Sequence, residues 1–320
     1  MPELSLFALI FLVSLFILIK AAKYFTLSAQ KIGLFFGITP FIIGVTIVSI
    51  GTSLPELISS IIATLKDSSE IVIGNVIGSN IANICLILGL AAIISPRALF
   101  IEYDLLDVDL PLFTGAAFFL ALTVANQQFS SGEAVLCVLG FFVYLLYAIN
   151  SGDRAPQENR DEKVKTTQPS KRSIYKEFII LFISAILIFI AANYTIDSVI
   201  KMAKFLNVGT EIIAVSAVAI GTSLPELIVT IKATQQGDPE MAIGNILGSN
   251  IFNSFAVMGI AGLVKELVIP ASVLREGIPV MLAVTILFFF TTQDKKVTKW
   301  EGWFFIIIYL WFMGKTLSFF

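Results

Sequence analysis

Long apolar runs alternate with short polar segments along almost the whole chain of 320 residues. A helix needs about 20 apolar residues to cross the hydrocarbon core of a bilayer, and these runs have that length or nearly so. The pattern therefore predicts an all-α, polytopic membrane protein with ten transmembrane helices. The ten runs fall at about 4–22, 40–65, 71–95, 110–132, 134–152, 178–196, 210–234, 241–264, 277–293 and 302–320.

Polar cassettes interrupt four of these runs, and they come in two matching pairs. The first cassette reads Gly-Thr-Ser-Leu-Pro-Glu and the second reads Gly-Asn-x-x-Gly-Ser-Asn. The first cassette occupies residues 51–56 and 221–226. The second, which continues three residues beyond this motif to a further asparagine, occupies residues 74–83 and 244–253. The copies are 170 residues apart, and residues 51–83 share 20 identities in 33 positions with residues 221–253, without a gap. The chain therefore contains an internal duplication.

Each first cassette places an acid and a helix breaker at membrane depth. Glu56 and Glu226 are the only charged residues in their central apolar stretches, where an uncompensated carboxylate is costly. Pro55 has no N–H, and its ring clashes with the carbonyl of Gly51, so the helix is predicted to break here. A broken helix is tolerated in a membrane where it lines a buried or watery cavity, which also suits a hard cation.

Composition supports a membrane protein and excludes several kinds of chemistry. The chain is 57% hydrophobic with a mean hydropathy of +0.92, and 14% of its residues are charged, against about 25% in soluble domains. The net charge of -2 gives no reason to expect a nucleic-acid partner. Histidine is absent, which excludes Ser-His hydrolases, His-based metalloproteases and haem ligation. Cys85 and Cys137 lie in apolar runs and are interpreted as packing residues.

The duplication divides the chain into a first five-helix repeat at 1–150, a polar linker at 151–170 and a second five-helix repeat at 171–320. An odd number of helices per repeat inverts the second copy in the membrane, as in many secondary transporters. If the N-terminus is outside, fifteen of the 21 basic residues fall on the inner side. The positive-inside rule thus predicts both termini outside and a cytoplasmic linker, in a plasma or bacterial inner membrane. With no basic residue before its first run, the N-terminus is interpreted as a membrane helix and not as a cleaved signal peptide.

Brought together, the cassettes supply only oxygen ligands. The carboxylates, hydroxyls, amide oxygens and broken-helix carbonyls suit Ca²⁺, which takes about six to eight oxygens, and Na⁺, whereas Zn²⁺ and Cu²⁺ sites use His or Cys. A purely structural alternative remains, in which these polar side chains only bond neighbouring helices. It is weakest for the two glutamates and stays open for the second-cassette residues Ser79, Asn83, Ser249 and Asn253, and for Asn75, Asn80, Asn245 and Asn250.

The paired cassettes in two five-helix halves resemble the cation/calcium antiporter superfamily, specifically its sodium/calcium exchanger branch and the small prokaryotic members. The resemblance covers essentially the whole chain. It implies ion ligands from the first cassette and its flank and from the second cassette of each half. In this sequence they are Ser49 (main chain), Thr52, Ser53, Glu56, Ser79 and Asn83, with Ala219 (main chain), Thr222, Ser223, Glu226, Ser249 and Asn253.

One position departs from the better-known sodium/calcium exchangers, which carry Asp where this chain has Asn253. Two carboxylates still balance one Ca²⁺, so calcium binding is expected to survive. The sodium count, proton occupancy and any potassium requirement are left open. The proton/calcium exchangers resemble the chain less, because their second cassette typically holds an additional acid.

The function implied is a secondary antiporter that exchanges Ca²⁺ for Na⁺ by alternating access and exports Ca²⁺ from the cytoplasm. Its expected partners are the two ions and the lipid bilayer, with no cofactor, no nucleic acid and no obligate protein partner. The alternatives are a proton/calcium or potassium-dependent exchanger, and a cation channel, which would conduct without counter-ion coupling. An enzyme is not expected, because the chain offers no nucleophile and base pair.

Overall fold

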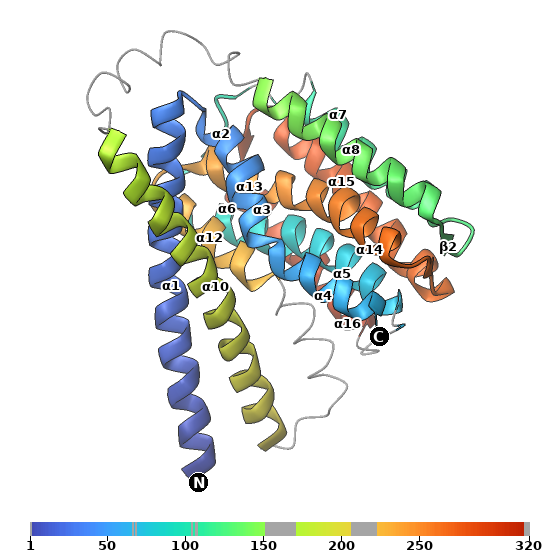
Figure 1. Cartoon of the computed structure of the whole chain (residues 1–320), viewed down its shortest axis with the longest axis horizontal. Coiled ribbons are helices and arrows are strands. Elements are labelled where there is room, and N and C mark those ends of the chain that lie inside the picture. The colour runs from blue at the N-terminus through green and yellow to red at the C-terminus, as the bar shows by residue number, and fades with distance from the viewer. Residues whose placement is uncertain are drawn as a thin grey trace.

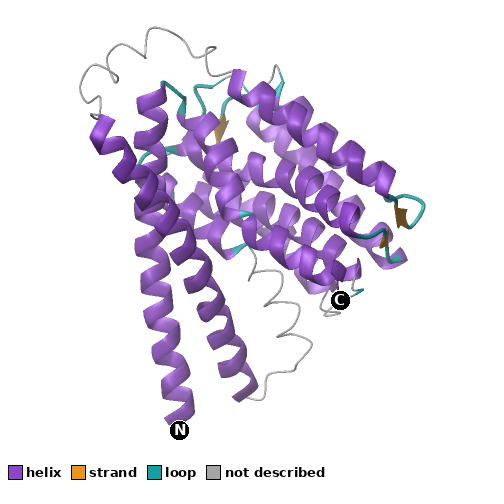
Figure 2. Cartoon of the chain, in the orientation of Figure 1, coloured by secondary structure: helices purple, strands orange, loops and turns teal. Residues whose placement is uncertain are grey.

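The computed structural model describes residues 2–65, 67, 69–103, 105, 108–150, 171–205 and 223–316. Helices make up nearly all of this part of the chain, and the strands within it form two short ribbons (Figure 2). Six described helices are long and apolar enough to cross a membrane, or seven when a bent pair is counted as one span. The prediction of an all-α membrane protein is confirmed.

The longest helices, α1 (Pro2–Phe36) and α10 (Lys171–Phe205), pack along each other at one side of the molecule (Figure 1). Both are longer than the apolar runs that predicted them, because hydropathy marks the bilayer and not the helix end. The end of α1 is set by Gly37, whose φ of +69° suits glycine, and the Ile38 amide donates to the Gly33 carbonyl at 2.8 Å.

The predicted break in the second span is confirmed. The span consists of α2 (Pro40–Ile43), the π-helical segment η1 (Gly44–Val48), α3 (Ser49–Thr52) and α4 (Leu54–Leu65). It bends by 41° at Ser53, between α3 and α4. Its counterpart in the second repeat is described from Ser223 onward, where α12 (Leu224–Gln235) begins with Pro225 in its first turn. The rest of the predicted 210–234 span lies outside the described residues.

Each second cassette lies on a mostly buried span with a π-helical centre. In the first repeat the span comprises α5 (Ser69–Ala82), η2 (Asn83–Leu88) and α6 (Gly89–Ile94). In the second it comprises α13 (Pro239–Ile251), η4 (Phe252–Val257) and α14 (Met258–Val264). A π-helical turn holds an extra residue, and such turns are frequent at functional sites. The two π-helical segments begin at Asn83 and next to Asn253.

The remaining helices surround these spans: α7 (Asp109–Thr123), α8 (Ser131–Asn150), η5 (Val273–Gly277) continuing into α15 (Ile278–Thr292), and α16 (Lys299–Thr316). Two antiparallel ribbons join the loops of the two repeats. One pairs β1 (Leu99–Phe100) with β4 (Lys296–Val297), and the other pairs β2 (Gln128–Phe129) with β3 (Leu267–Val268). The repeats are therefore hydrogen-bonded to each other at both ends of α7.

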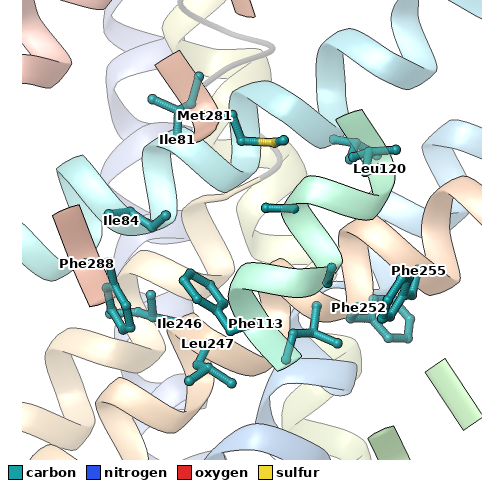
Figure 3. Packing of buried hydrophobic residues seen from close by; sticks show 14 of the residues in the cluster. Ile81, Ile84, Phe113, Leu120, Ile246, Leu247, Phe252, Phe255, Met281 and Phe288 are labelled. Atoms are coloured by element: carbon teal, nitrogen blue, oxygen red, sulfur yellow. The ribbon is translucent and has the colours of Figure 1, made fainter. Parts of the chain in front are cut away.

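The hydrophobic core lies where α5, α13 and their π-helical continuations meet α7 and α15 (Figure 3). Ile81 and Ile84 of the first repeat are buried in one cluster with Ile246, Leu247 and aromatic residues of the second. Cys85 and Cys137 are buried free thiols in this cluster, as their apolar surroundings predict. The core therefore belongs to both repeats and not to either one alone.

Glycines bring two main chains into direct contact at the centre. A Cβ on Gly248 of α13 would lie 2.6 Å from Ser49 Oγ and would overlap the main-chain oxygen of Val45. A Cβ on Gly44 would lie 3.0 Å from the main-chain nitrogen of Asn245. Because main-chain atoms cannot rotate away, α13 and η1 can pack this closely only without side chains at these positions.

Candidate ion-binding site

The two carboxylates lie in the first turns of the helices that follow the breaks. Glu56 on α4 is 1% exposed and Glu226 on α12 is 2% exposed. The amino end of a helix carries a partial positive charge, which favours an anionic side chain there. Each proline thus starts a helix whose first turn stabilises the buried carboxylate.

Hydrogen bonds at the breaks run between the repeats. The Ser53 hydroxyl donates to Glu226 Oε1 at 2.7 Å, and the Thr52 hydroxyl lies 3.3 Å from Asn245 Oδ1. Spacing along the sequence places Ser53 and Thr52 near Glu56 on a continuous helix, but the bend directs them toward the second repeat. Glu226 Oε2 is buried and accepts no hydrogen bond from the described residues. It is therefore an open ligand position.

Two further residues hold the first-cassette helices against the second-cassette helices. The Asn245 Nδ2 donates to the Thr230 hydroxyl at 2.8 Å, and Asn75 Nδ2 lies 3.4 Å from the Ser60 hydroxyl. These pairs are related by the same offset of 170 residues. The pattern of residues leaves the role of the two asparagines open and does not single out Ser60 or Thr230, although the offset preserves a hydroxyl at that position.

The second cassettes present amide and hydroxyl oxygens to the same region. Asn83 and Asn253 are each 1% exposed, and the Oδ1 atom of each accepts no hydrogen bond from the described residues. The hydroxyl of Ser249, on α13, and that of Ser223, at the second break, are likewise buried without a described partner. Ser79 is buried on α5 at the position equivalent to Ser249. The predicted residues therefore supply several oxygens that the described protein leaves available.

Ser49 is already hydrogen-bonded through both its main-chain oxygen and its hydroxyl. Its main-chain oxygen accepts the Ser53 amide at 3.0 Å and the Thr52 hydroxyl at 3.3 Å, and its own hydroxyl donates to the carbonyl of Val45. An ion at that carbonyl would require the Thr52 hydroxyl to rotate away. The other main-chain ligand expected, Ala219, and the neighbouring Thr222 lie outside the described residues.

The chemistry of this site is that of hard oxygen ligands. Among the described residues no group of three or more His, Cys, Asp or Glu side chains could hold a metal ion. The oxygens of the predicted ligands come instead from carboxylates, hydroxyls and asparagine amides. Such a set suits Ca²⁺ or Na⁺, whose coordination tolerates mixed oxygen donors and irregular geometry, better than a metal that needs nitrogen or sulfur.

Comparisons with known proteins agree with this chemistry. The family profile described as sodium/calcium exchanger protein matches residues 6–150 and 176–316. Sodium/calcium exchanger MaX1 of Methanosarcina acetivorans is 35% identical over 340 aligned positions, which cover 95% of this chain and 97% of MaX1. Inner membrane protein YrbG of Escherichia coli is 32% identical over 280 positions, which cover 87% of this chain and 86% of YrbG.

The fold also matches solved structures over nearly the whole chain. The structure of the sodium-calcium exchanger NCX_Mj soaked with 10 mM Na⁺ and zero Ca²⁺ matches with a TM-score of 0.82 and 30% sequence identity. The match covers 96% of this chain and 97% of that one. The resemblance inferred from the paired cassettes is therefore confirmed. The chain belongs to the sodium/calcium exchanger protein family, a family of transporters and not of enzymes.

Proposed function

We propose that the chain exchanges Na⁺ for Ca²⁺ at the oxygen cluster between the two repeats and exports Ca²⁺ from the cytoplasm. The observation that carries the proposal is the Ser53 to Glu226 hydrogen bond of 2.7 Å, with Glu226 Oε2 left open beside it. It brings the first cassettes of both repeats to one buried place. The proposed ligands are Ser49, Thr52, Ser53, Glu56, Ser79, Asn83, Ala219, Thr222, Ser223, Glu226, Ser249 and Asn253.

The charge of this cluster supports exchange at one shared site. Two carboxylates neutralise one Ca²⁺, and the same oxygens accept Na⁺, which is also a hard cation. Glu226 forms no salt bridge with a described basic residue, so its charge is available to an ion. A site that binds Ca²⁺ and Na⁺ in turn, but not together, produces antiport once it opens to each side of the membrane alternately.

The chain would cross the membrane ten times, as two inverted repeats of five helices at 1–150 and 171–320 with a linker at 151–170. The ribbons support this arrangement, since β1 and β4 pair at one end of α7 whereas β2 and β3 pair at the other. The family profile also matches in two segments, one on each side of the linker. Midplane breaks at Ser53 and Ser223 would then face each other as inverted copies.

Both termini would lie outside and the linker in the cytoplasm. Polar contacts support placing the end of α1, the start of α10 and the turn before α13 on the same side of the membrane. Lys31 pairs with Glu177 at 2.9 Å, and Gln30 donates to Asp238 at 3.0 Å. Lys265 pairs with Asp67 at the opposite end. A cysteine at Ser170, in a variant lacking Cys85 and Cys137, should react with an impermeant maleimide only from the cytoplasmic side. Labelling from outside would reverse the proposed orientation.

Access to the site would alternate by movement of the α1 and α10 pair, or of one repeat, against the rest. The packing of α1 against the break supports movement of the α1 and α10 pair. Phe25 lies against the break, where a Cβ added to Gly51 would come within 2.9 Å of its ring. A shift of α1 along its axis would carry this ring past Gly51 and change what covers the site.

The test is Ca²⁺ flux in proteoliposomes with sodium, potassium and proton gradients imposed singly. Only the sodium gradient should drive uptake in the unaltered chain. Glu56→Gln and Glu226→Gln should each lower flux by about 100-fold or more, because losing one charge from a buried, desolvated pair of opposite charges typically costs about 3–5 kcal/mol.

Glu133→Gln is the matched control, since Glu133 caps α8 through Ser130 and lies away from the cluster. Its flux should equal that of the unaltered chain. Normal flux from either cluster variant would place the ion site elsewhere.

A further inference from the structure

Four asparagines of the two second cassettes form a symmetric set of hydrogen bonds across the contact between α5 and α13. Asn83 Nδ2 donates to Asn250 Oδ1 at 2.8 Å, and Asn253 Nδ2 donates to Asn80 Oδ1 at 3.2 Å. Each ligand amide of one repeat is therefore held by an asparagine of the other. Asn80 and Asn250 are buried, with 2% and 3% of their surface exposed.

The orientation of Asn80 and Asn250 is fixed by groups that can only accept. Asn250 Nδ2 donates to the main-chain oxygen of Asn80 at 3.3 Å, and Asn80 Nδ2 lies 3.5 Å from the main-chain oxygen of Asn250. A carbonyl oxygen cannot donate, so these amides must turn their nitrogens toward it and their oxygens away. Asn80 is held further by Ser254, whose hydroxyl oxygen accepts from its Nδ2 at 2.9 Å.

The fixed amides of Asn80 and Asn250 determine how the ligand amides of Asn83 and Asn253 are oriented. With Oδ1 of Asn250 facing it, Asn83 must use its nitrogen in that bond, and its oxygen then points away. The same reasoning applies to Asn253 opposite Asn80. The oxygens that result are the buried Oδ1 atoms of Asn83 and Asn253 that accept no hydrogen bond from described residues. An amide turned the other way would present N–H groups, which repel a cation.

We propose that Asn80 and Asn250 are positioning residues that make the site selective for cations by fixing which end of the Asn83 and Asn253 amides faces the ion. Each acts across the repeat boundary, through the ligand of the other copy. This proposal rests on the ion site proposed above. It adds a chain of orientation: the main-chain carbonyls of Asn80 and Asn250 orient the side-chain amides of these two residues. Those amides in turn orient the amides of the ligands Asn83 and Asn253.

The test is a double-mutant cycle on Ca²⁺ affinity, read as the concentration that half-saturates both Ca²⁺ binding and exchange. Asn250→Ala frees the Asn83 amide to turn, so half-saturation should rise by about five- to tenfold while the maximal rate changes less than about twofold. In an Asn83→Ser background, Asn250→Ala should add less than about twofold, because its target amide is gone.

The matched control changes the other positioning residue, Asn80, in place of Asn250. Asn80→Ala acts through Asn253, so it should keep its full effect in the Asn83→Ser background. Equal, additive effects of Asn250→Ala with and without Asn83 would show a general packing role and overturn the proposal. Should Asn250→Ala fail to give a monodisperse protein, the mirrored cycle of Asn80→Ala with Asn253→Ser decides in the same way.

Glu226→Gln in the same assay separates this proposal from the one on which it rests. Loss of Ca²⁺ binding in Glu226→Gln together with additive asparagine effects would support the proposed ion site and overturn only the positioning role. Normal binding in Glu226→Gln would remove both.

Discussion

The helix pair at the side of the molecule and the helix pair at its centre are held by different contacts. In the spans of α1 and α10, 17% and 28% of the most apolar window is buried, against 72% and 83% in the spans of α5 and α13. The outer pair meets its neighbours through an apolar cluster that mixes alanines, such as Ala22 and Ala192, with larger side chains such as Phe25. At the centre, main chains touch at glycines, and amides bond across the repeats. The predicted ion ligands therefore lie where main chains are in direct contact, beside a helix pair that is less buried.

The largest expected effect comes from separating the central main chains. Gly248→Ala places a Cβ 2.6 Å from Ser49 Oγ and into the oxygen of Val45, and overpacking of this kind costs about 1–3 kcal/mol or more. Thermal unfolding should occur at a lower temperature, and Ca²⁺ binding should weaken because Ser49 and Thr52 shift. Gly115→Ala, at an exposed position on α7, is the control and should leave both unchanged. Equal melting temperatures for the two variants would mean that the centre is not rigid.

A smaller effect, confined to pH dependence, should come from Asn253→Asp. In the proposed site the introduced carboxyl group would join the two glutamates, and it would face Asn80 Oδ1, an acceptor that only a protonated acid can satisfy. Protonation should therefore compete with Ca²⁺, and uptake should fall as pH decreases from about 8 to about 6. The unaltered chain should respond less, because an amide does not titrate. Superimposable curves of uptake against pH and sodium concentration would place position 253 outside the ion site.

The smallest effect is expected at the outer pair. The Thr195 hydroxyl of α10 lies 2.9 Å from the Ser14 hydroxyl of α1. Hydrogen bonds between membrane helices contribute about 0.6 kcal/mol on average, so Thr195→Ala should change the exchange rate by less than about threefold. Val is the isosteric comparison at this site, and Thr195→Val should behave alike. A loss of exchange in both would indicate that the outer pair is fixed as firmly as the centre.

The sequence was sufficient to predict the break before α4 and the burial of both glutamates. Pro55 and Pro225 lack an amide proton wherever the helix is placed, and a lone glutamate at membrane depth has few structural explanations. The same offset that revealed the duplication also related Asn83 to Asn253. These features depend on covalent chemistry and on spacing along the chain, which are visible without coordinates.

Other features depend on which repeat faces which, and the sequence could not provide them. The bond from Ser53 to Glu226 joins positions 173 residues apart, and within-copy spacing suggested Glu56 as the neighbour instead. The π-helical turns at Asn83 and near Asn253 leave no mark in the hydropathy pattern, since the flanking residues are apolar on every side. The ends of α1 and α10 were missed because a helix continues past the bilayer until a residue such as Gly37 stops it.

The two ribbons restrict the mechanics of the transport cycle. β1 and β2 lie at opposite ends of α7, and their partners β4 and β3 lie at opposite ends of α15, so the two helices form a linkage closed at both ends. Phe113 and Phe288 fill the space between them, with ring centres 4.9 Å apart. Rotating one repeat against the other would have to stretch a ribbon at the end that opens. The helices α1 and α10 contribute no strand to this linkage, so a cycle that preserves both ribbons assigns the moving part to them. Its barrier then comes from apolar side chains passing one another and from side-chain hydrogen bonds such as Gln30 to Asp238, and not from the breaking of main-chain hydrogen bonds.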